Sequence, residues 1–70
     1  RPAAVETGQS VVLPRGATVY DVARPAQKLG RLRSGATVTV VGFEHGGRVR
    51  IRFRAGNGER EGLVSKFDLP

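Results

Sequence analysis

The sequence contains no cysteine and a single histidine, His45, and both scarcities restrict its chemistry. Disulfide bonds are excluded, and one histidine without cysteines cannot complete a zinc shell. A hydrolytic site needs a nucleophile held against a base, yet none of the three serines lies in a Gly-flanked nucleophile turn. The neighbouring acids Glu59 and Glu61 fall in an exposed turn region. We therefore expect no enzyme activity, no metal and no cofactor.

Tryptophan is also absent, and the aromatic residues are one tyrosine and three phenylalanines. These are too few and too scattered to form a platform for stacking nucleic-acid bases. No apolar run approaches the roughly 20 residues that cross a bilayer, so we expect no membrane span. Seventy residues make one small domain at most, with little room for a deep enclosed pocket.

Basic residues outnumber acidic ones by twelve to six, which gives a formal net charge of +6. Ten of the twelve are arginines, whose planar guanidinium suits bidentate contact with phosphate or carboxylate. An anionic partner is therefore plausible, although the charge alone does not identify it. The chain begins with Arg1 rather than Met, and we expect it to be a piece of a larger protein.

Short extended segments separated by Gly-rich turns run through the chain. Residues 1–10 have no period and predict an N-terminal arm or linker, which leaves residues 11–70 as the domain. No window shows a helical period, so the pattern predicts a small all-β barrel or sandwich of five or six antiparallel strands. The predicted strands are residues 11–13, 17–21, 29–33, 37–41, 48–55 and one starting at 62–64, and residues 65–67 could form one helical turn.

The clearest segment is residues 48–55, in which apolar residues alternate with arginines. Such a period of two puts Val49, Ile51 and Phe53 on the core face of a strand and the arginines on the other. Gly46 and Gly47 before it, and the Gly56 to Gly58 turn after it, predict hairpins on both sides. The expected core consists of Val19, Leu29, Leu32, Val38, Val40, Val49, Ile51, Phe53, Val64 and Leu69.

The arginine face has two interpretations. If the segment holding Arg31 and Arg33 lies beside residues 48–55, the guanidinium groups form one basic face that could track phosphates or carboxylates. Alternatively, the arginines are an ordinary solvated face, covering apolar surface with their stems and partly neutralised by acids such as Glu44 and Glu61. The arginines of the longer segment are Arg48, Arg50, Arg52 and Arg54.

Tyr20 is the candidate groove residue. It follows the core residue Val19, so it should point outward, at the mouth of the loop that contains Pro25. Arg24 lies in the same loop. The complete set of candidate ligand-binding residues is Tyr20, Arg24, Arg31, Arg48, Arg50, Arg52, Arg54 and Leu63.

The segments follow one another in a recognisable order: an extended start, a Pro loop, a strand into a Gly turn, a β-branched strand, a tight hairpin, another strand and a segment in the place of a final Gly-aromatic-Val. The residues in these places are Val19, Pro25, Leu29, Leu32, Gly35, Val38, Val40, Gly46, Gly47, Val49, Ile51, Gly62, Leu63 and Val64. Over residues 11–69 this order resembles the bacterial SH3-like domain family. Two positions depart from the family pattern, since Arg48 and Leu63 stand where aromatic residues often line a ligand groove.

The resemblance implies an SH3-like barrel that serves as a non-catalytic binding or targeting module. Family members bind cell-envelope peptides, glycans or protein segments, often beside a hydrolase domain, which implies an extracytoplasmic location in a bacterium. Small SH3-like barrels also bind RNA and DNA, so a nucleic-acid-binding module that uses the arginine face is the alternative. A structural spacer without a ligand is a third possibility, and the oligomeric state stays open.

Overall fold

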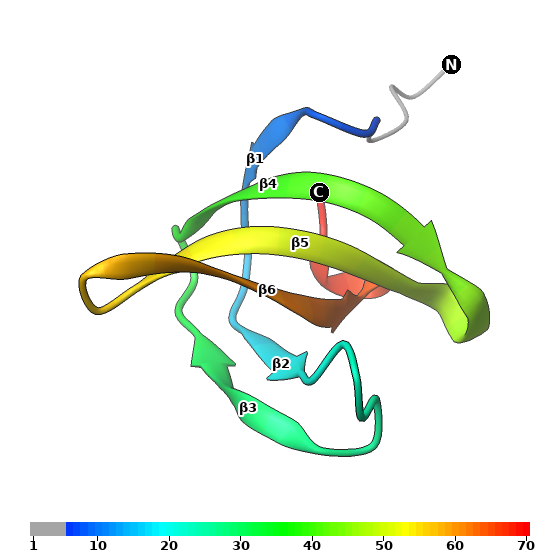
Figure 1. The fold of residues 1–70 in the computed structure, drawn as a ribbon. Coiled ribbons are helices and arrows are strands. Elements are labelled where there is room, and N and C mark those ends of the chain that lie inside the picture. Colours follow the sequence, from blue (N-terminus) through cyan, green and yellow to red (C-terminus); the bar gives the residue numbers. More distant parts are fainter. Residues whose placement is uncertain (1–5) are drawn as a thin grey trace.

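Six antiparallel strands form one sheet in the computed structural model, which describes residues 6–70 (Figure 1). Within those residues the only helical turns are two short 3-10 turns, so the prediction of an all-β domain is confirmed. In chain order the strands are β1 (Ser10–Val12), β2 (Ala17–Tyr20), β3 (Lys28–Leu32), β4 (Thr37–Glu44), β5 (Arg48–Ala55) and β6 (Gly58–Ser65). The turns are η1 (His45–Gly47) and η2 (Lys66–Asp68).

The strand order across the sheet is β1-β4-β5-β6-β2-β3. The long strands β4, β5 and β6 curve together through the middle of the molecule, and β2 and β3 form a hairpin beside them (Figure 1). In the described part of the chain, β1 and β3 are the two ends of the sheet, and no pairing joins them to close it. This order leaves β3 as an edge strand, with β2 as its one strand partner.

Glycines make the two hairpins around β5 possible. Gly46 and Gly47 have φ of 77° and 74°, and Gly56 has φ of 60°. This left-handed region is open to glycine and strained for other residues, so the sequence positions of these glycines fix where the chain reverses. The predicted limits of β5 agree with the observed ones as a result.

The core lies on one face of the curved sheet, and the prediction of most of its members is confirmed. Leu32 and Leu69 are only partly buried and pack against the core from its margin. Val11, Leu13 and Ala17, near the N-terminal end of the domain, also belong to the core and were not predicted. Short strands contain too few residues for the alternation of apolar and polar side chains to identify the buried face. The confirmed residues are Val19, Val38, Val40, Val49, Ile51, Phe53 and Val64.

The prediction that Leu29 belongs to the core is wrong, because 43% of its surface is exposed. A register irregularity between Val19 and Tyr20 puts Gly30 opposite Val19 and Lys28 opposite Tyr20. Leu29 is therefore the extra residue of a bulge, and simple alternation from Leu32 fails to predict its environment.

The chain ends of the domain also differ in detail from the sequence-based segments. Gly8 donates its N–H to the carbonyl of Val40 (2.7 Å), and Val40 donates to the carbonyl of Gln9 (2.9 Å), so part of the expected arm is bonded to β4. Residues 1–5 of that arm lie outside the described residues. The single helical turn expected near residues 65–67 is confirmed as η2, where the Ser65 hydroxyl accepts a hydrogen bond from the N–H of Phe67 (3.2 Å).

Candidate functional site

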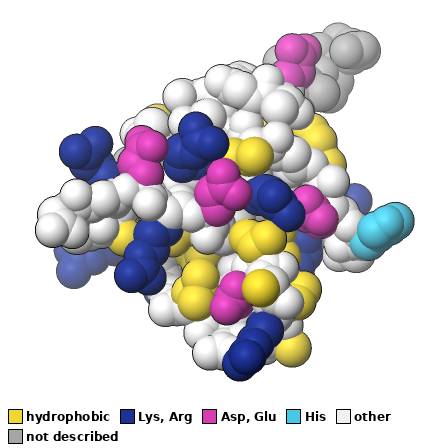
Figure 2. Space-filling view, viewed as in Figure 1, with side chains coloured by type: hydrophobic (Ala, Val, Ile, Leu, Met, Phe, Trp, Pro, Cys, Tyr) yellow, Lys and Arg dark blue, Asp and Glu magenta, His cyan; other side chains and the backbone are white. Residues whose placement is uncertain are grey.

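The arginines of β5 lie on the outer face of the sheet, as predicted, but their surroundings differ from one to the next. Antiparallel register puts Arg48 opposite Ser65, Arg50 opposite Leu63, and Arg52 opposite Glu61. Residues directly opposite each other share a face, so this outer face mixes basic, acidic and apolar side chains. Figure 2 shows acidic side chains alternating with basic ones across the middle of this view.

Ion pairs occupy the two central arginines. The Nε atom of Arg50 lies 3.4 Å from the Glu44 carboxylate, and its Nη1 lies 3.9 Å from Glu61. Arg52 contributes a hydrogen-bonded pair with the Glu61 carboxylate at 3.3 Å. Two acids thus neutralise much of the charge that a phosphate backbone would need to find on this strand.

On the same face, Arg48 contacts both Tyr20 and the loop that contains Pro25. Its guanidinium carbon stands 4.0 Å from the centroid of the Tyr20 ring, which is a cation–π distance. The same guanidinium donates a hydrogen bond to the carbonyl of Pro25 in the loop after β2. Tyr20 does lie beside the Pro25 loop, as predicted, but Arg48 already covers one face of its ring.

Leu63 has only 4% of its surface exposed, although it lies on the outer face of β6. It stands in register with Arg50 on one side and Tyr20 on the other, so the neighbouring side chains and their stems cover it. The expectation that Leu63 lines a ligand groove is therefore wrong, because its apolar side chain is buried beneath the neighbouring side chains of the outer face.

Arg31 and Arg24 lie outside β5, although Arg31 lines the same pocket as Arg54 and Arg24 precedes Pro25, whose carbonyl Arg48 binds. Arg31 lies on β3, where its Nη1 donates to the Thr18 hydroxyl at 3.2 Å. The strands β6 and β2 separate β3 from β5, so the two arginine groups do not form the single basic face that adjacency would have given. Arg24 is exposed in the loop between β2 and β3, and its carbonyl accepts the N–H of Gln27 at 2.8 Å.

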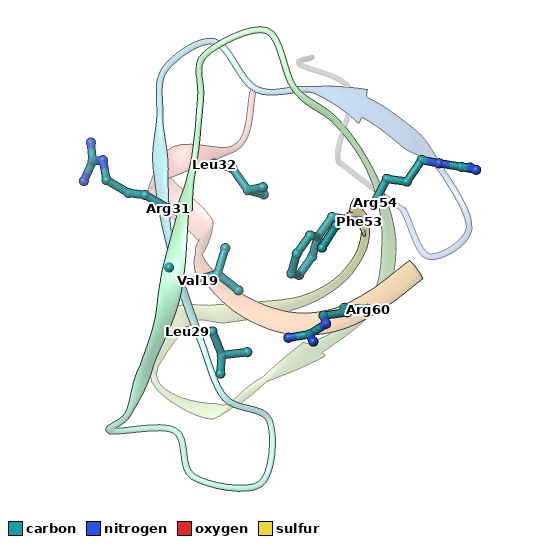
Figure 3. A pocket seen from close by; sticks show the side chains of 9 residues that line it. Val19, Leu29, Arg31, Leu32, Phe53, Arg54 and Arg60 are labelled. Atoms are coloured by element: carbon teal, nitrogen blue, oxygen red, sulfur yellow. The ribbon is translucent and has the colours of Figure 1, made fainter. Parts of the chain in front are cut away.

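A pocket of about 320 Å³ opens between β3, at one end of the sheet, and the β5–β6 hairpin. In Figure 3 Val19, Leu29, Leu32 and Phe53 point into it, while Arg31 and Arg54 reach away from it. Arg60 extends toward Leu29 across the cavity in the same view. The remaining lining residues are Gly30 and Ala55. An apolar wall with one inward guanidinium suits a ligand group that is apolar on one side and anionic on the other.

The pocket exists partly because Gly30 carries no side chain. Gly30 stands opposite Val19 in the register of β2 and β3, which is the core-facing side. A Cβ atom built there would meet no heavy atom within 4 Å, so open space lies directly over this backbone. By contrast, a Cβ on Gly62 would come 2.3 Å from Val19 Cγ1, which shows how closely packed the neighbouring core is.

Three of the basic groups that form no ion pair lie around this pocket. Across residues 6–70, the recorded ion pairs engage Arg50 and Arg52 and leave Arg31, Arg54 and Arg60 without an acidic partner. Arg60 stands opposite Phe53 in the β5–β6 register, on the core-facing side, whereas Glu59 and Glu61 stand on the outer side. The pocket end of the domain therefore carries positive charge next to an apolar surface.

Sequence reasoning named Arg31 and Arg54 but missed Arg60 and the apolar pocket wall. The polar run from residue 58 to 61 has no apolar alternation, so β6 was expected to begin near Gly62 and Arg60 was assigned to a turn. One signal was present in Leu29-Gly30, a large apolar residue beside a glycine inside a strand, which is a pattern found where a ligand or another backbone approaches closely.

Comparisons with known proteins found no match among family models, curated proteins or solved structures. In the described part of the chain, no helix is long and apolar enough to cross a membrane. Residues 6–70 also hold no cluster of three His, Cys, Asp or Glu side chains placed to bind a metal ion.

Proposed function

We propose that this chain is a non-catalytic binding module of the SH3-like type, and that it recognises a peptide or protein segment through the pocket beside β3. The SH3-like assignment rests on the sequence pattern, and the short antiparallel strands with a 3-10 turn near the C-terminal end are consistent with it. A role in a larger bacterial protein at the cell envelope is part of the same proposal and rests on the resemblance alone.

The observation that carries the proposal is the combination of an apolar pocket with the inward Arg60. Burying one apolar side chain there contributes about 1.5–3 kcal/mol, which corresponds to about a 10- to 150-fold gain in affinity. A carboxylate within reach of Arg60 adds a charge-assisted hydrogen bond and selects the orientation. The preferred segment therefore presents a large apolar residue with Asp or Glu close to it.

Nucleic-acid binding is the weaker candidate, because Glu44 and Glu61 neutralise the central arginines of β5. The residual positive charge still predicts loose, salt-sensitive attraction to any polyanion, since released counterions drive such binding. Binding of an oligonucleotide that persists at physiological salt and survives a blocked pocket would favour this alternative over a peptide.

The test blocks the pocket without disturbing the fold. A random dodecapeptide library is selected on the domain, and the enriched peptides are titrated by fluorescence anisotropy against the wild type, Gly30→Val and Gly42→Val. Both glycines lie in strands with open space at the Cβ position and with φ outside the left-handed region. Gly42 stands opposite Arg50 on the outer face, which makes it the matched control.

We expect Gly30→Val to weaken peptide binding by at least tenfold and Gly42→Val to change it less than twofold. Enriched peptides should carry a large apolar residue with an acid within two positions. Equal binding to both variants, or a library without enrichment, would contradict the proposal.

A further inference from the structure

We propose that the bound segment is an extended strand that pairs with the free edge of β3, with alternating apolar and acidic residues. This inference rests on the proposed function and specifies how the pocket recognises its ligand.

The first support is the position of β3. In the described residues it pairs with β2 alone, so every second residue of Lys28–Leu32 turns its N–H and C=O away from any strand partner. Natural proteins usually cover or blunt such an edge, because it is a template for pairing with another chain. Four of the five residues of β3 are exposed, so nothing in residues 6–70 covers it.

The second support is that the pocket follows this strand. Leu29, Gly30, Arg31 and Leu32 are consecutive, and all four line the pocket. A segment that adds beside β3 lies about 4.8 Å from it, and its side chains alternate between the two faces. Those on the core-facing side enter the pocket toward Phe53, over the gap left at Gly30.

The third support is charge, which decides between an acidic segment and a second copy of this chain. Lys28 and Arg31 lie on the edge strand, and Arg54 and Arg60 line the pocket opposite it. Pairing of β3 with β3 from another copy would bring these like charges together, at a net charge of +6 per chain. An acidic strand meets opposite charges at the same positions, with acids on the Arg31 side and an apolar residue on the pocket side.

The main experiment separates backbone pairing from simple pocket filling. An enriched peptide is synthesised with single N-methyl groups at successive backbone amides, and each version is titrated against the wild-type domain. We expect an alternating pattern, in which methyl groups on amides that face β3 reduce affinity at least tenfold and those in between change it less than threefold. Hydrogen exchange of the 15N-labelled domain should slow at alternate amides of Lys28–Leu32 on saturation, with no change in β1.

Charge reversal tests the side-chain part of the proposal. Arg31→Glu should weaken the acidic peptide at least fivefold, and replacing the facing acid of the peptide by Lys should restore binding to this variant. Lys66→Glu, an exposed change of the same charge in η2, is the matched control, because Lys66 packs against Gly47 at the opposite end of β5 from the pocket, and it should have less than a twofold effect.

The outcomes are distinguishable. A flat methylation pattern without β3 protection, for a peptide that still loses binding in Gly30→Val, would overturn strand addition and leave the proposed function standing. A peptide insensitive to Gly30→Val would overturn both. Analytical ultracentrifugation of the free domain should show a monomer at 100 µM, a concentration about a hundred times a dissociation constant of about 1 µM. A dimer that disappears in Gly30→Val would show that a second copy is the occupant and overturn the assignment to an acidic segment.

Discussion

Replacing Gly62 by Ala should destabilise the domain, because the new methyl group has no space. A Cβ at this position would lie 2.3 Å from Val19 Cγ1, 3.2 Å from the Tyr20 carbonyl oxygen and 3.3 Å from Phe53 Cε1. Overpacking of this kind costs about 1–3 kcal/mol. A 70-residue domain has roughly 4–10 kcal/mol of total stability, so the loss is a large fraction. In urea, with a slope of about 1 kcal/mol per molar, the unfolding midpoint should fall by about 1–3 M.

The same substitution at Gly30 should act in the opposite direction. Its Cβ position is empty, so the methyl group of alanine fits there. The unfolded chain has less conformational freedom with alanine than with glycine, so Gly30→Ala should stabilise the folded domain by about 0.4–1 kcal/mol. Each variant adds one methyl group, into occupied space at Gly62 and into open space at Gly30, and urea unfolding followed by circular dichroism compares them directly. A Gly62→Ala protein as stable as the wild type would refute the packing described around β6.

Other substitutions test separate parts of the structure. Ile51→Ala, at a fully buried core position, should cost about 2–5 kcal/mol in urea unfolding. Glu61→Gln breaks only partly exposed ion pairs, so it should change stability by less than about 1 kcal/mol, and raised salt should shrink the difference. Arg48→Ala should change the fluorescence of Tyr20, the single tyrosine, and speed hydrogen exchange in the loop whose carbonyl it binds. His45→Ala, in an exposed turn, should leave the unfolding midpoint and peptide affinity unchanged within error.

The parts of the fold that the sequence predicts well are those specified locally. The eight residues of β5 alternate strictly, and both of its ends are set by glycines that take positive φ. The strand, its two faces and its hairpins therefore follow from nearest neighbours in the chain. The same holds for the turn η2, which a Ser65 cap stabilises.

Leu29 and Leu63 show which features of the fold a local sequence pattern does not predict. Leu29 was expected in the core and is 43% exposed, whereas Leu63 was expected to line a ligand groove and is almost fully buried. A bulge moves the first, and the neighbouring Tyr20 and Arg50 cover the second. Both effects depend on which strands become neighbours and in what register, and a single sequence contains no direct record of that.

The arginines divide by the same long-range arrangement. In the sequence, Arg50, Arg52 and Arg54 form one uniform series, but folding gives the first two acidic partners and leaves the third, with Arg31 and Arg60, around the open end of the sheet. Glu44 and Glu61 lower the net positive charge that an anionic ligand would meet at Arg50 and Arg52. Part of the positive charge outside these ion pairs therefore lies where β3 has a free edge and where Gly30 leaves a gap in the pocket wall. Backbone donors, apolar surface and unpaired charge meet at this one place, so an acidic extended segment can use all three together.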